Sequence, residues 1–362
     1  MAGARFKIFV PAATRIIPPS RLVNMLRWHT LAVYFRRKYG TRVQKIPLDA
    51  GASCPNRDGA LSRCGCTFCN ASGSGSGLGG RGFSLDNQWL AWLEKYRTTD
   101  ADRAFMAYLQ SYSNTYGSPE RLQLLLQQVA ALPGCLGVAV GTRPDCLDQR
   151  KLDMLAACGA PVSVTVRDAK HYTRNADGDN GQKSGLAEVW LELGLQSMHD
   201  ATLRRINRGH NAACSEWAVR AAAARGLAVC GHLMAGLPGE DEKAFLQSLD
   251  WALSLPLRGL KIHNVYVPLG TALARQYEEG GYKPLARDEY VDLLCAALPR
   301  IPSTMIMHRV QSDPAPGELL APAWAAEKRG VITDLRRAMT ARDLWQGKAA
   351  DVPEARPEWY GG

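Results

Sequence analysis

A short loop that contains four cysteines constrains this chain more than any other stretch. Cys54, Cys64, Cys66 and Cys69 fall within sixteen residues, in a segment that also holds Pro, Asn, Asp and several Gly. The segment has no apolar period, so it is expected to form neither a helix nor a strand. Thiolates gathered in this way select zinc, copper(I) or an iron–sulfur cluster. We therefore expect a loop that holds a metal centre.

Three kinds of site compete for this loop. A zinc ribbon normally needs two C-x2-C pairs, and the loop has one, from Cys66 to Cys69. A disulfide scaffold is untypical of a chain of 362 residues. The third is a [4Fe–4S] cluster held by three cysteines, which leaves one iron open for a substrate or cofactor, as catalytic zinc keeps an open position. Phe68 fits this third kind, because an aromatic ring beside the last cysteine can cover the cluster and pack on a bound adenine.

The loop and the segments after it resemble the radical S-adenosylmethionine (radical SAM) enzymes, more narrowly their YhcC/YtqA-like branch, which is related to the elongator and methylthiotransferase groups. The matching stretches include CPNRDG, CTFC, GTRPDCL, LELGLQSMHDATLRRINRGH, HLMAGLPGE and KIHNVYVPLGT. The resemblance implies that Cys54, Cys66 and Cys69 bind a [4Fe–4S] cluster and that S-adenosylmethionine binds the open iron. The family usually carries Gly at the position of Cys64, so we expect Cys64 not to bind the cluster.

The resemblance also implies which side chains hold S-adenosylmethionine. Arg208 follows Gln196 by twelve residues, the spacing at which related enzymes place an arginine on the carboxylate of the cofactor. A guanidinium suits that group because it pairs with a carboxylate bidentately. Glu192 and Gln196 are expected at the ribose hydroxyls or the amine. The alternative for Glu192 is a paired carboxylate at the end of a strand.

Four further positions are expected near the cofactor. His232 lies four residues before GLPG, where relatives place a polar residue at the ribose, and the alternative is a satisfied core histidine. Gly236 belongs to a tight turn near the adenine, where its role is backbone shape. Gln110 follows the second predicted strand, at the place of a Gly-Gly-Glu segment that many relatives carry and this chain lacks. Arg143 reaches cofactor or substrate unless it only pairs with Asp145.

Lys261 and His263 are the candidate catalytic residues. They alternate along the last predicted strand, so both side chains point to one face, which we place in the barrel interior. A buried lysine without a partner is costly, and this favours a substrate or cofactor role.

Strand and helix patterns alternate along the rest of the chain. Strands are predicted at residues 43–48, 105–110, 136–141, 189–193, 227–235 and 260–267, with helices at 21–38, 85–96, 119–132, 147–158, 218–225, 240–253, 287–298 and 324–345. Repeated β–α units of this length imply parallel strands with right-handed crossovers. Six units give an α/β fold with a partial (β/α)6 TIM-type barrel, which agrees with the resemblance.

We expect three parts in the chain. These are a basic N-terminal extension and helix (1–40), a radical SAM partial barrel (41–284) and a C-terminal helical extension (285–362). The connection at 160–187 is longer than usual and is interpreted as a surface insertion, with a hairpin arm at 162–166.

The net charge of +10 comes entirely from the N-terminal segment. Residues 1–45 carry ten basic and no acidic residues, while the rest of the chain has 34 of each. This pattern favours phosphate contacts with RNA, and the alternatives are a solvated helix face and a transit peptide. No run of eighteen apolar residues predicts a membrane span. Ten cysteines in a chain of this size fit a reducing compartment, so we expect a cytoplasmic protein.

Together these features predict a radical SAM enzyme that receives an electron from an external donor and cleaves S-adenosylmethionine to a 5′-deoxyadenosyl radical, which abstracts hydrogen from the substrate. The resemblance implies tRNA as substrate, at the side chain of the wobble uridine. One alternative is a radical SAM enzyme that acts on a small molecule or peptide. Another is a metal-stabilised RNA-binding protein without activity, which the ELGLQS and INRGH segments disfavour.

Overall fold

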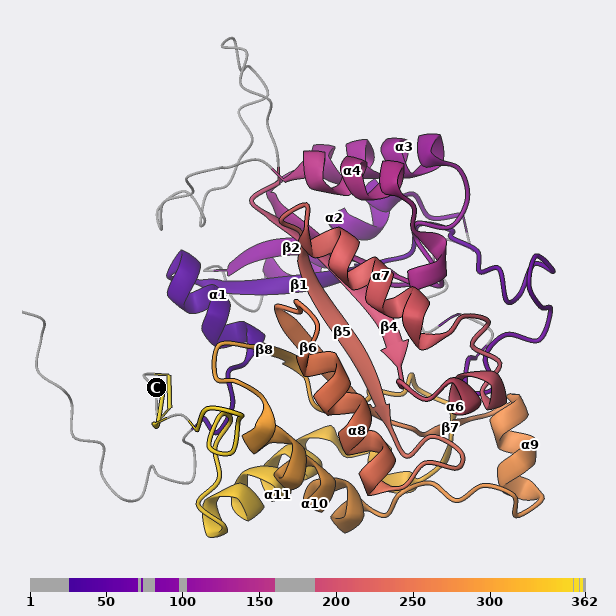
Figure 1. The fold of residues 1–362 in the computed structure, drawn as a ribbon. Coiled ribbons are helices and arrows are strands. Elements are labelled where there is room, and N and C mark those ends of the chain that lie inside the picture. The colour runs from indigo at the N-terminus through magenta and orange to yellow at the C-terminus, as the bar shows by residue number, and fades with distance from the viewer. Residues whose placement is uncertain are drawn as a thin grey trace, which may run out of the picture.

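The computed structural model describes residues 26–70, 73, 82–97, 103–159, 186–353, 355–357 and 359–360. In this part of the chain a seven-stranded parallel sheet curls into a partial barrel (Figure 1), with the strand order β1-β2-β3-β4-β5-β6-β8. The strands are Arg42–Leu48 (β1), Arg103–Leu109 (β2), Cys135–Thr142 (β3), Glu188–Gln196 (β4), Ala228–Ala235 (β5), Gly259–Asn264 (β6) and Ile306–Arg309 (β8). The predicted α/β fold with a partial TIM-type barrel is confirmed.

Helices that follow the strands cover the outer face of the sheet. They are α2 (Leu85–Arg97), α3 (Pro119–Ala131), α4 (Gln149–Cys158), α7 (Ala212–Ala223), α8 (Glu242–Leu253), α10 (Arg287–Ala297) and α11 (Lys328–Ala341). Several begin where the sequence supplies an N-cap, as at Ser118, Asp148 and Asn211, whose side chains accept hydrogen bonds from the first turn. Their apolar faces and the outward side chains of the strands form the main core.

Helix α1 (Leu31–Tyr39) closes the barrel at the amino ends of the strands. It begins after the N-cap Thr30 and ends at Gly40, which adopts the left-handed conformation at φ 65°. Its Phe35 and Tyr39 join a second apolar cluster with inward-facing strand residues such as Trp190. Because this end is filled, only the carboxyl ends of the strands can open into a site.

The sequence did not reveal several short elements, most of them in the C-terminal third of the chain. Strand β8 lies in the segment assigned to a helical extension, and it extends the sheet beside β6. The short strands Val267–Pro268 (β7) and Leu319–Ala321 (β9) pair antiparallel, and two short helices, Asp200–Arg205 (α6) and Ala272–Glu278 (α9), were also missed.

Some expectations stay untested. The hairpin arm at 162–166 and most of the predicted insertion lie outside the described residues, as does the start of the helix predicted at 21–38. The division of the chain at residues 40 and 284 stays a prediction. Within the described part, no helix has both the length and the apolar character that crossing a membrane requires.

Gly137 on β3 lies close against the backbone of β4. A Cβ at this position would lie 2.3 Å from the carbonyl oxygen of Glu188 on β4. We expect Gly137→Ala to lower the free energy of unfolding by about 1–3 kcal/mol, because the added methyl must push the strands apart. Denaturant unfolding of the anaerobic protein measures this change.

Gly281→Ala is the matched control for this substitution. A Cβ there meets a single neighbour, the carbonyl oxygen of Gln276 at 3.4 Å, so we expect a change within about 0.5 kcal/mol. Equal stabilities of the two variants would contradict the close approach at Gly137.

Candidate active site

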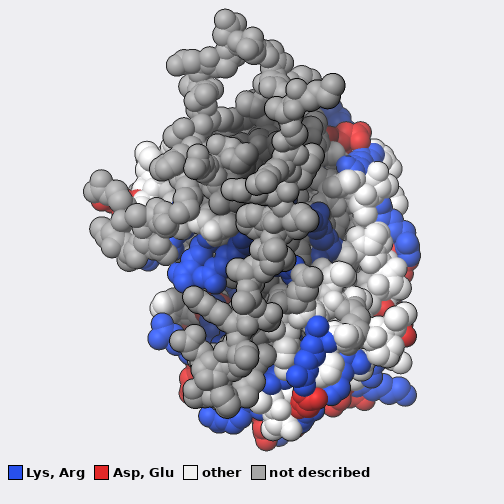
Figure 2. Space-filling view, turned by 90° about the vertical axis from the view of Figure 1, so that its left-hand side faces the viewer, with Lys and Arg blue, Asp and Glu red and all other residues white. Residues whose placement is uncertain are grey.

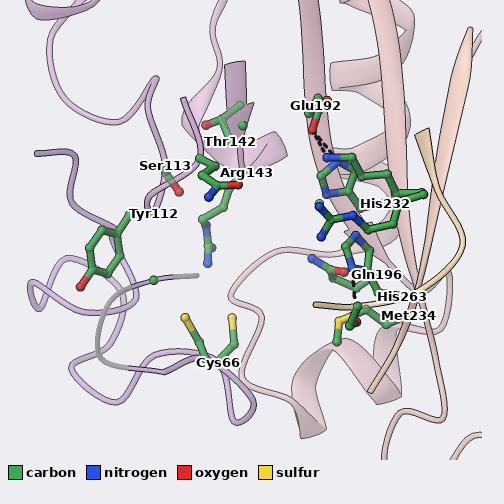
Figure 3. Close-up of a pocket in the computed structure, with 18 of the residues that line it drawn as sticks. Cys66, Tyr112, Ser113, Thr142, Arg143, Glu192, Gln196, His232, Met234 and His263 are labelled. Atoms are coloured by element: carbon green, nitrogen blue, oxygen red, sulfur yellow. Dashed lines mark hydrogen bonds and ion pairs between the residues drawn. The ribbon is translucent and has the colours of Figure 1, made fainter. Parts of the chain in front are cut away.

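A cavity of about 560 Å³ opens inside the barrel, lined by residues of all seven strands and of the cysteine loop, residues 54–69. Figure 3 shows Cys66 and Arg143 on one side of it and Glu192, His232 and His263 on the other. Barrels of this kind place their chemistry at the carboxyl ends of the strands. The cavity is therefore the candidate active site.

The cysteine loop is fixed to the segment that follows α6. The Asn56 side chain donates a hydrogen bond to the carbonyl of Asn207 (2.6 Å), and the Asn207 side chain donates to the carbonyl of Gly65 (2.7 Å). The backbone N–H of Thr67 donates to the carbonyl of Ile206 (3.0 Å). These bonds give an irregular loop a defined position at the cavity mouth, although it has no secondary structure of its own.

Three of the loop's four thiols have an arginine beside them. Two pairs are direct contacts with sulfur: Cys54 with Arg143 (Sγ to Nη1, 3.9 Å) and Cys66 with Arg208 (Sγ to Nη1, 3.7 Å). Beside Cys69, Arg57 donates to the backbone carbonyl (2.7 Å); burial raises the pKa of the Cys69 thiol, and Arg57 opposes that rise. Guanidinium groups at this range stabilise negative charge on sulfur. Cys64 is exposed and points to none of these arginines in the described contacts.

This donor set fits an iron–sulfur cluster. Among the described residues, no three His, Cys, Asp or Glu side chains lie close enough to hold a single metal ion. A cluster does not require that spacing, because each cysteine binds a different iron. Burial and the neighbouring Cys66 raise the pKa of the Cys69 thiol, so binding of iron must displace a proton.

Beside Cys66 the structure brings together Arg208 and Gln196, as expected. Arg208 is buried, and its Nη2 donates to the carbonyl of Gly194 (2.8 Å). Its Nε has no hydrogen-bond partner within the described part of the chain. Gln196 adopts the left-handed conformation at φ 71°. A Cβ at Gly194 would lie 2.6 Å from Gln196 Nε2 and 2.7 Å from Arg208 Nη2, so the glycine leaves the room that these two side chains occupy.

Three other predicted cofactor contacts differ in their relation to the cavity. Phe68 lines it and packs against an apolar cluster that includes Met234. Gln110 also lines it. Gly236 does not line it; its carbonyl accepts a hydrogen bond from Tyr282 Oη (2.8 Å), and its φ of 85° shapes the turn after β5.

Arg143 both pairs with Asp145 and reaches the cysteine loop. Its Nε and Nη2 donate to the two carboxylate oxygens of Asp145 at 2.8 and 2.6 Å. The ion pair was the alternative expectation, and it fixes the guanidinium so that Nη1 faces Cys54. Burial by itself would lower the pKa of Arg143, but the hydrogen bonds to Asp145 outweigh this effect and raise that pKa above its ordinary value.

Glu192 departs most from its expected surroundings. It is fully buried, and its two oxygens accept hydrogen bonds from the ammonium groups of Lys45 and Lys261. Lys261 also donates to Tyr108 Oη (2.9 Å). The premise that Lys261 lacks a partner is therefore wrong. Glu192 is a paired carboxylate, although in the middle of β4 rather than at its end, and its contact with the ribose or the amine stays a prediction. Lys261 does point into the barrel, as its alternation predicted.

Two histidines complete the arrangement around Glu192. His232 Nε2 and His308 Nδ1 each lie 3.3 Å from a carboxylate oxygen of Glu192. We call Lys45, Tyr108, Glu192, His232, Lys261 and His308 the charged layer. His263 lies next to it, with its ring centroid 5.5 Å from that of His232, and Ser312 Oγ lies 3.4 Å from its Nδ1.

Sequence reasoning missed two members of the charged layer. Lys45 was counted with the basic N-terminal segment, although its place in the predicted strand 43–48 was a usable signal for an interior side chain. His308 was missed because β8 was missed. Both face the interior by the alternation of their strands.

The histidines of the charged layer are neutral at pH 7. Burial, reinforced by Lys261, lowers the pKa of His232 to about 4. Burial, reinforced by Lys45, lowers the pKa of His308 to about 3. Burial alone would raise the pKa of Glu192, but Lys261 and Lys45 outweigh it and hold that pKa well below its usual value. The carboxylate is therefore ionised.

The lowered pKa of His308 predicts a pH-dependent stability. In the unfolded chain His308 has a pKa of 6.5 and binds a proton below that pH, whereas in the folded protein it binds a proton only near pH 3. The stabilisation is thus complete above pH 6.5 and is lost as the pH falls. We expect His308→Asn to reduce the slope of unfolding free energy against pH, near pH 5.5, by roughly 1 kcal/mol per pH unit. Denaturant titrations across this range measure the slope, and an unchanged slope would refute the assignment.

Family models match the sequence in two adjoining regions. The Radical SAM superfamily model matches residues 182–252, and the Radical_SAM C-terminal domain model matches residues 257–341. Several proteins match along most of the chain, among them YtqA and YhcC. YtqA of Bacillus subtilis strain 168 is 33% identical over 89% of this chain and 92% of its own length. YhcC of Escherichia coli K12 is 33% identical over 89% of this chain and 94% of its own length.

More distant similarities agree on the fold. Elongator complex protein 3 of Saccharomyces cerevisiae is 28% identical over 58% of this chain and 33% of its own length. The solved structure of an N-terminally truncated archaeal Elp3 from Methanocaldococcus infernus covers 84% of this chain and 64% of its own, with a TM-score of 0.59 and 17% sequence identity.

Proposed function

Because the chain belongs to the YhcC-like radical SAM enzymes, whose cofactors are a [4Fe–4S] cluster and S-adenosylmethionine, we propose that Cys54, Cys66 and Cys69 hold the cluster and that the substrate is the side chain of a wobble uridine in tRNA. The observation that carries the first part is that these three cysteines line one cavity, with Arg143 and Arg208 in contact with the Cys54 and Cys66 sulfurs and Arg57 bonded to the Cys69 backbone and lowering the pKa of its buried thiol against the rise that burial causes.

When bound, the reduced cluster supplies the electron that cleaves S-adenosylmethionine to methionine and a 5′-deoxyadenosyl radical, which abstracts hydrogen from the substrate. The residues of this chain bind, orient and shield. Arg208 carries a buried, unpartnered Nε beside Cys66 and offers it to the carboxylate of the cofactor. Gln196 lies next to Arg208, and its side-chain amide can hydrogen-bond to the amine and carboxylate end of the cofactor.

The remaining cavity walls limit where the adenosyl part can lie. Phe68 supplies an aromatic face at the mouth for the adenine. The neutral rings of His232 and His263 face the cavity from β5 and β6 and can hydrogen-bond to ribose or substrate hydroxyls. These groups reach the interior from rigid strands, so they hold a ligand in one orientation.

The cluster assignment predicts different behaviour for neighbouring cysteines. We expect Cys54→Ala, Cys66→Ala or Cys69→Ala to lose most of the iron and sulfide and the EPR signal of the reduced protein, because each removes a ligand. Cys64→Ala is the control; since Cys64 is exposed, this variant should keep four irons and an EPR spectrum that changes on addition of S-adenosylmethionine.

The contrary results are equally clear. Zinc in place of iron, or a cluster whose spectrum ignores S-adenosylmethionine, would leave the metal-stabilised RNA-binding protein as the better account. Iron loss in Cys64→Ala with retention in Cys54→Ala would change the ligand set.

The proposal of tRNA as substrate rests on charge and on the branch that the sequence resembles. The last turn of α1 carries three basic residues, and ten lie within residues 1–45 without any acidic residue. Figure 2 looks at the side on which α1 lies in Figure 1 and shows Lys and Arg side chains gathered on this face. Such a surface contacts phosphates and positions an RNA without reading its sequence.

Binding of tRNA should therefore depend steeply on salt. We expect replacement of four basic residues by Gln to reduce the slope of log affinity against log salt concentration by roughly 3, because fewer counterions are released. The four are Arg5, Lys7, Arg15 and Arg21. A filter-binding or fluorescence titration at several salt concentrations measures the slope.

The matched control removes four basic residues that lie on the surface of the described part of the chain. These are Lys243, Lys283, Arg204 and Arg329. If both quadruple variants bind tRNA equally, or if binding is weak and independent of salt, the N-terminal segment is not the RNA contact and a small-molecule or peptide substrate becomes the better account.

A further inference from the structure

The floor of the cavity carries more positive than negative charge. Two carboxylates line the cavity among the described residues, Glu192 and Asp313. Asp313 pairs with the exposed Lys328 (2.6 Å) and so does not reach the floor as a free charge. Glu192 is shared by the ammonium groups of Lys45 and Lys261. One carboxylate therefore faces two cations.

Arg309 adds a third cation beside the charged layer. It lines the cavity at the end of β8. Burial lowers the pKa of His263 and Arg309 lowers it further, while burial raises the pKa of Tyr108 and Arg309 opposes that rise. The histidines do not change this balance, since burial lowers the pKa of His232 to about 4, so its ring is neutral at pH 7. The floor holds three formal positive charges against one negative charge.

Donor capacity also remains at this end of the cavity. Lys45 donates to Glu192, and its next polar neighbour is His308 Nδ1 at 3.5 Å, a long contact. The Nε2 atom of His263 is buried and has no hydrogen-bond partner in the described structure. Buried cations and polar atoms without full partners are costly, and a bound anion would offset that cost.

We propose that the inner end of the cavity binds an anionic group of the substrate, a carboxylate or a phosphate, between Lys45, Lys261 and Arg309. This deepens the proposed function and rests on it in one respect: the substrate enters the same cavity as the cofactor. The site uses other cations than the cofactor's own carboxylate would, because Arg208 contacts the Cys66 thiol and the carbonyl of Gly194, two residues beyond Glu192 on β4 toward the cysteine loop.

The subsite gives the charged layer a part in orientation. Lys261 is fixed by Glu192 and Tyr108, and Lys45 by Glu192, so both ammonium groups are held in place before any ligand arrives. A substrate anchored there by one anionic end directs its other end toward the cluster side of the cavity. Lys45, Lys261 and Arg309 are thus substrate-binding residues, and Glu192 is a positioning residue that acts through the lysines.

The test is anion binding by the anaerobically purified protein without S-adenosylmethionine. Sodium phosphate and sodium acetate are titrated against sodium chloride at constant ionic strength, and the thermal midpoint is followed. We expect a saturable rise with at least one of the two anions. Stronger binding of phosphate indicates a phosphate group of the substrate, and stronger binding of acetate indicates a carboxylate.

Lys45→Gln is the decisive variant, because it leaves Lys261 and Glu192 as a one-to-one pair and so should fold. It should weaken anion binding at least tenfold. Arg309→Gln should also weaken binding, which keeps the proposal testable if Lys45→Gln folds poorly. Lys283→Gln, which removes an exposed lysine that does not line the cavity, should bind the anion as the parent does.

Three results would overturn the proposal. The first is no saturable response in the parent protein. The second is an equal response in Lys45→Gln. The third is loss, in Lys45→Gln, of the EPR change caused by S-adenosylmethionine, which would assign the subsite to the cofactor. Since anion binding is measured without the cofactor, failure of this proposal and failure of the cluster assignment can be told apart.

Discussion

The carboxylate of Glu192 is the constraint on which the barrel interior depends. It is fully buried on the central strand β4, and it contacts lysines of β1 and β6. In a flat sheet β1 and β4 would be about 14 Å apart, since three strand spacings separate them. An unpaired carboxylate at this depth costs several kcal/mol. The sheet must therefore curl until side chains of both flanks meet across the interior, and the charged layer and the closure of the partial barrel stabilise each other.

That layer divides the interior into two regions with different tasks. Toward the amino ends of the strands, Trp190 packs with Phe35 and Tyr39 of α1, and this filling is apolar. Toward the carboxyl ends lies the polar cavity, with the cysteine loop across its mouth. The alternation of each strand produces this order, because inward residues two apart on β4, Trp190 and Glu192, lie one layer apart. Many of the side chains that line the cavity therefore come from packed strands, and the cysteines come from a loop.

Local sequence patterns predicted the strands and helices, but the contacts between distant side chains depend on how the sheet curls and could not be predicted from them. The apolar runs of parallel buried strands revealed six strands near their observed bounds. Strand β8 has only four residues and two of them are partly exposed, so it gave too little pattern to detect. Alternation placed Lys261 in the interior, but its partner Glu192 lies 69 residues earlier, and only the curl of the sheet brings the two together. Arg143 and Arg208 likewise reach Cys54 and Cys66 from distant segments, so the spacing of the thiols indicated a metal centre but not its electrostatic surroundings.

The cavity floor carries more cations than are needed to neutralise Glu192. An apolar group of similar size in place of the carboxylate and its lysines would often be as stable, so stability alone does not explain a buried ionic layer. Two lysines on one carboxylate, with Arg309 nearby, instead leave a fixed positive field at one end of the cavity, opposite the thiols. Abstraction of hydrogen requires reacting atoms roughly 3–3.5 Å apart in a defined orientation. Shape alone would let a small ligand slide along the cavity, whereas a fixed charge at the floor sets the distance between its anchored end and the cofactor.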